Sequence, residues 1–151
     1  MRAVVRRVLK ASVRAEGELT GEIGPGLLVY LGVAAEDEDT DLSWLAAKVA
    51  GLRVFDDEEG RMNLSLRETG GEALVASQFT LYGNVRKGTR PSFNHAAPPE
   101  KGQAGYEAFV EALSDHLGKP VPTGVFGAHM EVQAHNDGPV TLFIDTHNKK
   151  L

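Results

Sequence analysis

The sequence of 151 residues contains no cysteine, and this absence removes several kinds of chemistry at once. Disulfide bonds, zinc–thiolate sites and thiol nucleophiles all require a cysteine side chain. A chain without cysteine is compatible with a reducing compartment, so we expect a cytoplasmic protein. Long apolar runs are also missing, because Arg2, Arg6 and Arg7 interrupt the apolar residues near the N-terminus. We therefore expect neither a signal peptide nor a membrane span.

The sequence has no excess of basic residues. Its formal net charge at pH 7 is −5, whereas nonspecific binding to nucleic acid normally needs a basic face. We therefore predict no DNA partner and no broad grip on RNA. A small nucleic-acid footprint stays possible, because some basic residues gather locally, as at Arg86, Lys87 and Arg90.

Motifs for metals and nucleotide cofactors are absent or incomplete. The glycines between Gly21 and Gly26 precede an expected strand rather than open a helix, which excludes a dinucleotide-binding loop. Asp37 to Asp41 resembles the start of a calcium loop, but Leu42 replaces its invariant glycine. His129 and His135 share one face of an expected strand, but that face is polar and solvated. We predict no metal and no cofactor.

The hydrophobic pattern predicts one α+β domain. Period-two alternation and short apolar runs predict strands, and apolar spacings of three and four residues predict helices. Two main helices, one beginning at Asp39 or Thr40 and one over about Glu100–Leu117, should cover one side of a curved sheet. The expected strands are Arg2–Val13, Glu18–Ile23, Leu27–Val33, about Leu52–Phe55, Met62–Leu66, Ala73–Ala76, and two that flank a turn, Met130–Ala134 and Val140–Ile144.

The segment from Asn136 to Thr141 contains a Gly-Pro pair, Gly138-Pro139. X-Pro bonds have little preference for trans, and glycine removes the Cβ clash, so this pair suits a cis peptide bond. Two carbonyls that point the same way would then form an acceptor pair for an ammonium group. The simpler alternative is an ordinary hairpin turn, because Asp-Gly between two apolar runs is a strong turn signal.

A second polar interruption, Ser77-Gln78-Phe79-Thr80, follows an apolar strand. Its backbone N–H groups and hydroxyls are suited to a carbonyl under attack. The alternative is that this segment is only the polar end of a buried strand, where hydroxyls cap loose backbone groups. The two polar segments together would hold an α-amino acyl group by its backbone atoms.

Arg7 falls on the apolar face of the first strand, together with Ala3, Val5 and Leu9. A buried guanidinium needs several acceptors to offset its desolvation, and the backbone carbonyls of the Gly-Pro turn would serve. The alternative is an arginine that extends past the sheet edge into solvent.

Together with Met62-Asn63-Leu64, Lys87-Gly88-Thr89-Arg90-Pro91-Ser92-Phe93 and Gly26-Leu27-Leu28-Val29, these motifs resemble those of the D-aminoacyl-tRNA deacylases. The resemblance covers residues 1–144, which we take as the deacylase domain, and leaves residues 145–151 as a tail to which we assign no role. It implies a layered, barrel-like curved sheet and a homodimer with each active site at the subunit interface.

The resemblance also implies roles for individual residues. Gly138 and Pro139 would form a cis peptide that enters the partner's site, reads the amino group and rejects L-amino acids, with Asn136 beside it and Arg7 holding the turn. The backbone N–H groups of Phe79 and Thr80 would bind the ester carbonyl. Ser77 and Gln78 would shape the pocket around the terminal adenosine.

The implied reaction is hydrolysis of the ester that joins a D-amino acid to the 3′ end of tRNA. Glycine has no side chain to reject, so glycyl-tRNA mischarged on tRNA for alanine should also react. The resemblance suggests that the ribose 2′-hydroxyl assists the attacking water. Two rivals remain: Thr80 or Ser77 is a covalent nucleophile, or the protein is a noncatalytic dimer that binds RNA ends or a partner protein.

Overall fold

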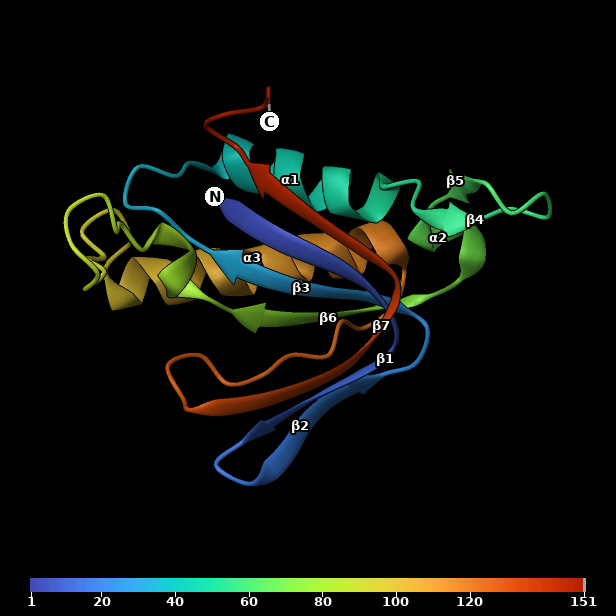
Figure 1. Cartoon of the computed structure of the whole chain (residues 1–151), viewed down its shortest axis with the longest axis horizontal. Coiled ribbons are helices and arrows are strands. Elements are labelled where there is room, and N and C mark those ends of the chain that lie inside the picture. The colour runs from blue at the N-terminus through green and yellow to red at the C-terminus, as the bar shows by residue number, and fades with distance from the viewer. Residues whose placement is uncertain (151) are drawn as a thin grey trace.

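The protein, seen here as a computed structural model that describes residues 1–150, is a curved sheet with helices on one side (Figure 1). This confirms the predicted single α+β domain. Both main helices are present, and a third helix of four residues was not predicted. The elements in chain order are β1 (Arg2–Ala15), β2 (Glu18–Ile23), β3 (Gly26–Gly32), α1 (Asp39–Gly51), β4 (Phe55–Asp56), β5 (Met62–Leu64), α2 (Leu66–Thr69), β6 (Glu72–Ser77), the 3-10 helix η1 (Phe79–Tyr82), α3 (Pro99–Leu117) and β7 (Met130–Asp145).

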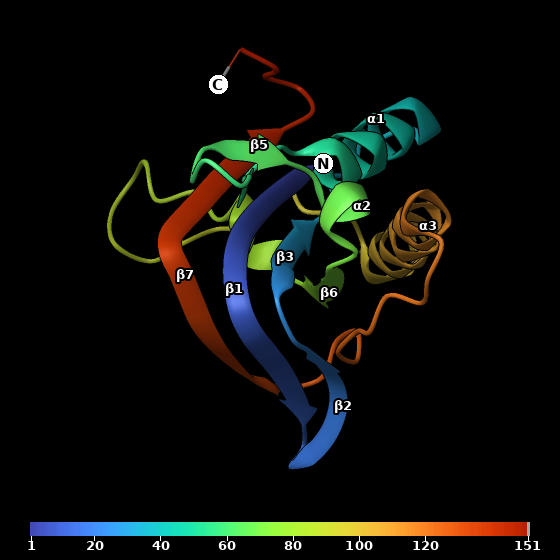
Figure 2. The same cartoon turned by 90° about the vertical axis from the view of Figure 1, so that its right-hand side faces the viewer.

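The long strand β1 organises the sheet. On one side β1 pairs with β3 through its first half and with β2 through its second half, and on the other side it pairs with β7 along most of its length. All of these pairings are antiparallel, whereas β6 joins β3 in parallel. The resulting sheet curls into a half barrel, which is clearest from the side (Figure 2).

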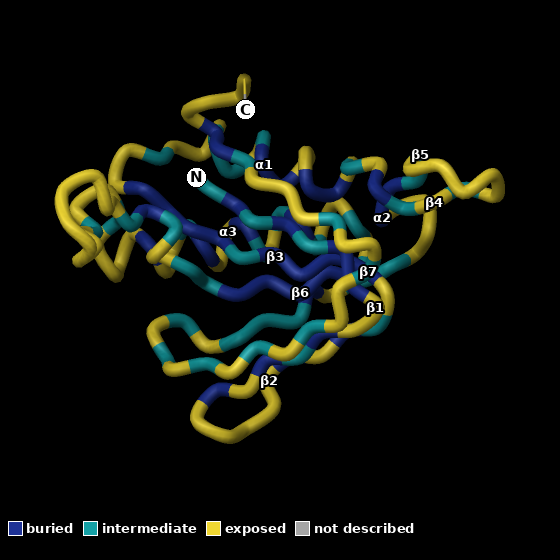
Figure 3. Tube along the Cα trace, in the orientation of Figure 1, coloured by how far each residue is buried: buried dark blue, intermediate teal, exposed yellow. Residues whose placement is uncertain are grey.

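The main core lies between the sheet and the helices α1 and α3. Leu27 and Val29 of β3 are fully buried against Leu45 of α1 and Phe109 of α3. Burying such a side chain contributes about 1.5–3 kcal/mol, so these contacts hold the two layers together. The central strands are buried, whereas β7 is largely exposed (Figure 3). Within residues 1–150 no helix is both long and apolar enough to cross a membrane.

Local signals set the helix ends. Glu38, one residue before the predicted cap, is the N-cap of α1, and its amide donates to the Asp41 carboxylate at 3.0 Å. Gly118 ends α3 in the left-handed conformation, at φ 68°, as its position after the helix predicts. The helix α2 has a capping box between Ser65 and Glu68. Its sequence, a serine followed three residues later by glutamate, is a helix-start signal that outweighs the predicted strand through residue 66.

Two strand predictions were wrong. The Gly-Pro segment does not join two hairpin strands, because both halves of β7 pair with β1 and the strand continues from Met130 to Asp145. The register shifts at the segment, where Arg6 pairs with Thr141 and Val8 with Asn136, so the intervening residues bulge. The same irregularity reverses the alternation of β1: Val8 is buried and Leu9 is 55% exposed.

Candidate active site

The strand β6 ends where η1 begins, and this junction exposes two backbone amides. The last sheet bond is donated by the Gln78 amide to the Leu31 carbonyl at 2.7 Å. The next two amides, those of Phe79 and Thr80, have no acceptor among residues 1–150, because they open a 3-10 helix. The junction therefore offers two adjacent donors to an oxygen atom outside the chain.

An apolar cavity of about 390 Å³ adjoins these amides. Phe79, which is 57% exposed, packs edge-on against Phe93 with ring centroids 5.0 Å apart. Ser77 and Phe126 also line the cavity. Aromatic faces of this kind can hold a flat ring such as a nucleobase.

The hydroxyls at this junction have no histidine partner. Thr80 Oγ1 accepts a hydrogen bond from the Gln78 side chain. His95, the histidine nearest in sequence, lines a different cavity, and no hydrogen bond joins it to Ser77 or Thr80 in the described part of the chain. The geometry of a base-activated hydroxyl nucleophile is thus absent from this chain.

The Gly-Pro segment protrudes from β7 and contacts Arg7. The Gly138–Pro139 peptide bond is cis, and both residues are exposed. Arg7 is only 8% exposed, and its guanidinium donates to the carbonyls of Val54 at 2.6 Å and Asp137 at 3.2 Å. It also lies 3.5 Å from the Asp56 carboxylate. The guanidinium therefore links the Gly-Pro segment to the chain around β4.

The other predicted residue of this segment, Asn136, takes part in a surface contact. Its side-chain oxygen accepts a hydrogen bond from Arg6 Nε at 3.1 Å. Asn136 is exposed, as are Gly138 and Pro139. The segment thus presents its outer surface to solvent in the single chain.

One chain does not bring the two predicted halves of the site together. Arg7, beside the Gly-Pro segment, pairs with Leu27, which is level with Ala73 of β6, whereas Ser77 lies four residues further along that strand. Four residues along a strand and three strand spacings across the sheet separate the two by about 20 Å. Figure 1 shows the same separation, with β4 at one end of the sheet and the chain after β6 at the other.

A second, polar cavity of about 520 Å³ lies beside the other end of η1. Tyr82 of η1 lines it, and burial raises the pKa of the Tyr82 hydroxyl, to which nearby carboxylates add. Arg86 reaches this cavity from the basic loop. The remaining charged and histidine side chains of its lining are Arg2, Glu36, His95, Asp145 and His147.

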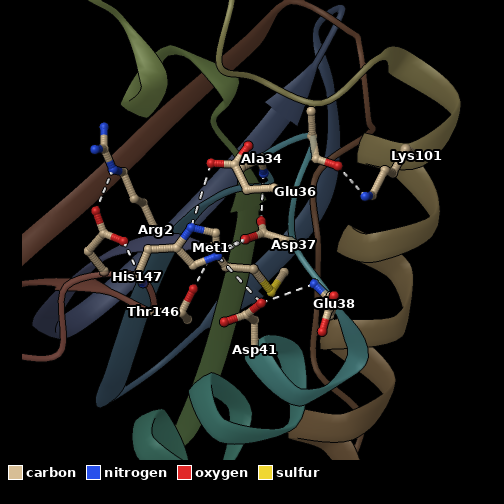
Figure 4. A network of polar contacts seen from close by, with 12 residues as sticks. Met1, Arg2, Ala34, Glu36, Asp37, Glu38, Asp41, Lys101, Thr146 and His147 are labelled. Atoms are coloured by element: carbon tan, nitrogen blue, oxygen red, sulfur yellow. Dashed lines mark hydrogen bonds and ion pairs between the residues drawn. The ribbon is translucent and has the colours of Figure 1, made fainter.

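A polar network around the N-terminus forms one wall of this cavity (Figure 4). The Met1 ammonium is buried and donates to the carboxylate of Asp37 and to the hydroxyl of Thr146, and His147 Nε2 lies 3.1 Å from Asp37. Asp37, Asp41 and His147 form the one group of metal-type ligands among residues 1–150. The ammonium already balances Asp37, so these side chains form an internal ion-pair cluster.

The first residues of the predicted tail belong to this network. Asp145 Oδ2 accepts from Arg2 Nε at 2.8 Å, and Asp145 Oδ1 accepts from the His147 amide at 2.9 Å. Burial raises the pKa of Asp145, but the bonds from Arg2 and His147 and the nearby ammonium lower it further, and the net shift is downward. Leu151, the last residue of that tail, lies outside the described residues. Sequence patterns gave no signal for this network, because it joins the two ends of the chain.

Comparisons with known proteins identify the family. A family model described as D-Tyr-tRNA(Tyr) deacylase matches residues 4–145. A D-aminoacyl-tRNA deacylase of Opitutus terrae is 56% identical over 99% of this chain and 100% of its own, and one of Thermotoga petrophila is 56% identical over 97% of both chains. This chain belongs to the D-aminoacyl-tRNA deacylase family. Its members are hydrolases, so the resemblance is confirmed and a noncatalytic binding module is excluded as its main function.

Solved structures of the deacylase fold agree with this assignment. A structure titled c-Myc DNA Unwinding Element Binding Protein is 40% identical, with a TM-score of 0.89 over 96% of this chain and 98% of its own. A probable eukaryotic D-amino acid tRNA deacylase superposes with a TM-score of 0.82 over 95% and 97% of the two chains at 18% identity, which shows the shared fold.

Proposed function

We propose that this deacylase hydrolyses the ester of D-aminoacyl-tRNA in the cytoplasm by using the Phe79 and Thr80 amides as its oxyanion hole. The observation that carries the proposal is the pair of adjacent amides without an acceptor, next to an aromatic cavity suited to the terminal adenine. When water attacks the ester carbonyl, negative charge develops on the carbonyl oxygen. One such donor contributes about 3–4 kcal/mol in a well-studied hydrolase.

The proposed mechanism needs no strong protein base. An aminoacyl ester is already activated, and the ribose 2′-hydroxyl next to it can orient the attacking water. The absence of a histidine bonded to Ser77 or Thr80 favours this mechanism over a covalent one. Ser77 and Gln78 would then shape the pocket, and Arg86, Lys87 and Arg90 would contact the phosphates of the 3′ end.

Chirality would be read by the Gly138-Pro139 segment of a second copy. The segment is exposed and lies about 20 Å from the amides of its own chain, so a homodimer is the simplest arrangement that joins both halves. If carbonyls of the segment bind the substrate's amino group while the amides bind its ester, an L side chain points at the segment and a D side chain points away. Glycyl-tRNA should therefore be hydrolysed as well.

A paired assay tests stereospecificity. Purified protein is incubated with D-Tyr-tRNA, L-Tyr-tRNA and glycyl-tRNA, and ester loss is followed under single-turnover conditions. We expect hydrolysis of the D and glycyl esters and survival of the L ester. Equal loss of the D and L esters would contradict the proposed exclusion, and survival of the glycyl ester alone would refute the idea that only a side chain is rejected.

Thr80→Ala separates the two mechanisms, because it removes the hydroxyl and keeps the backbone amide. We expect the rate on D-Tyr-tRNA to stay within about threefold of wild type, and Ser77→Ala serves as the matched variant for the other hydroxyl. Loss of more than about a thousandfold in a folded Thr80→Ala or Ser77→Ala protein would instead indicate a covalent nucleophile.

The homodimer has its own test, in which sedimentation velocity measures the mass of the species. A dimer that carries the activity, with loss of activity on dilution to monomer, is the expected result. Full activity of the monomer would overturn the proposed contribution of a second copy. DNA remains an unexpected ligand despite the printed name of one relative, because the net charge of −5 disfavours it.

A further inference from the structure

The 3-10 helix η1 is held from behind by one side chain, Arg2. Its guanidinium Nη1 donates to the Leu81 carbonyl at 2.9 Å, and its Cζ lies 4.6 Å from the centre of the Tyr82 ring. In the described part of the chain, no other side chain donates a hydrogen bond to a main-chain carbonyl of η1. Two of the four η1 residues therefore contact Arg2.

Arg2 is itself oriented by the end of β7. Asp145 is buried and accepts from Arg2 Nε at 2.8 Å, and Thr146, the next residue, accepts from the Met1 ammonium beside Arg2. Figure 4 shows these contacts side by side. A guanidinium fixed at Nε by a carboxylate keeps its plane and presents Nη1 in a defined direction.

The opposite face of η1 has little room to move. A Cβ on Gly32 of β3 would lie 3.0 Å from the Gln78 carbonyl oxygen and 3.2 Å from Leu81 Cβ. The helix therefore sits directly on the β3 backbone, and Arg2 closes it from the side of the polar cavity. Displacing the two free amides by even a few tenths of an ångström would weaken bonds whose strength depends on distance and angle.

We propose that Arg2, oriented by Asp145, is a positioning residue that aims the Phe79 and Thr80 amides at the ester oxygen, and that the end of β7 thereby contributes to the reaction rate. This inference rests on the proposed oxyanion role of those amides. Arg2 touches no substrate atom in this scheme. Its effect belongs to the chemical step, because the amides bind the oxyanion more strongly than the ground-state carbonyl.

The test compares Arg2→Ala, Arg2→Lys and Asp145→Asn with Arg14→Ala, which removes an exposed arginine of the same strand far from η1. Single-turnover hydrolysis of D-Tyr-tRNA gives the rate constant at saturation and the apparent affinity separately. We expect Arg2→Ala to lower the rate constant about tenfold with affinity changed less than twofold. Arg2→Lys and Asp145→Asn should fall between Arg2→Ala and wild type, and Arg14→Ala should match wild type.

A second measurement reports on the amides directly, whatever the activity. Amide NMR shifts of Phe79 and Thr80 should move in Arg2→Lys and Asp145→Asn but not in Arg14→Ala. Unmoved amides with an unchanged rate constant would overturn the role of Arg2. A loss confined to affinity would also overturn it and would assign Arg2 to tRNA binding. Moved amides with an unchanged rate would instead refute the oxyanion role on which the inference rests.

Discussion

Replacing Arg7 by lysine tests whether the buried guanidinium holds the Gly-Pro segment. Arg7 donates to two carbonyls, those of Val54 and Asp137, which belong to separate segments. A lysine ammonium at the end of an unbranched chain cannot reproduce the fork of a guanidinium, so one carbonyl loses its partner. Leaving a buried polar group unsatisfied costs about 1–3 kcal/mol, which corresponds to about 2–12 °C in melting temperature for a chain of this size.

The assay is chemical denaturation of Arg7→Lys beside Arg14→Lys, an exposed arginine of the same strand whose replacement should change the free energy of unfolding by less than about 0.5 kcal/mol. We also expect Arg7→Lys to hydrolyse L-Tyr-tRNA measurably faster than wild type, because the segment that excludes the L side chain is less firmly held. An Arg7→Lys protein as stable and as stereospecific as Arg14→Lys would refute the reasoning.

The remaining predictions concern the same segments. Gly138→Ala should destabilise the fold by about 1–3 kcal/mol in denaturant titrations and impair D-Tyr-tRNA hydrolysis, because φ is +118° and the new Cβ would lie 3.0 Å from Arg7 Nη2; wild-type stability would contradict this. The pKa of Asp145 is lowered in the fold, so its contribution to stability is complete at neutral pH and is lost as pH falls below about 4. The difference in unfolding free energy between wild type and Asp145→Asn should therefore shrink between pH 7 and about pH 3, and a constant difference would argue against the lowered pKa. EDTA should leave deacylation unchanged, whereas dependence on added zinc would revive the pair His129 and His135 as a metal site.

Much of the fold could be predicted because it depends on short-range patterns. The main helices follow from apolar spacing and from end signals such as Gly118, and the inner strands from apolar runs such as residues 27–33. Strand pairing escaped prediction at the Gly-Pro segment, where the local turn signal indicated a hairpin and β1 instead pairs with both halves of β7. The buried position of Arg7 followed from alternation, whereas the exposure of Leu9 depends on a bulge that alternation cannot reveal.

The sequence by itself determined the chemical inventory: an acidic chain without cysteine, a Ser-Gln-Phe-Thr segment that ends a strand, and an arginine among apolar neighbours. These properties depend on residue type and on spacing within one element. Only the tertiary structure decided which groups meet, including the acceptors of Arg7 at Val54 and Asp137 and the clasp of Met1 and Arg2 with Asp145 and Thr146. Such contacts join residues up to 145 positions apart, and their geometry is set by how the sheet curls.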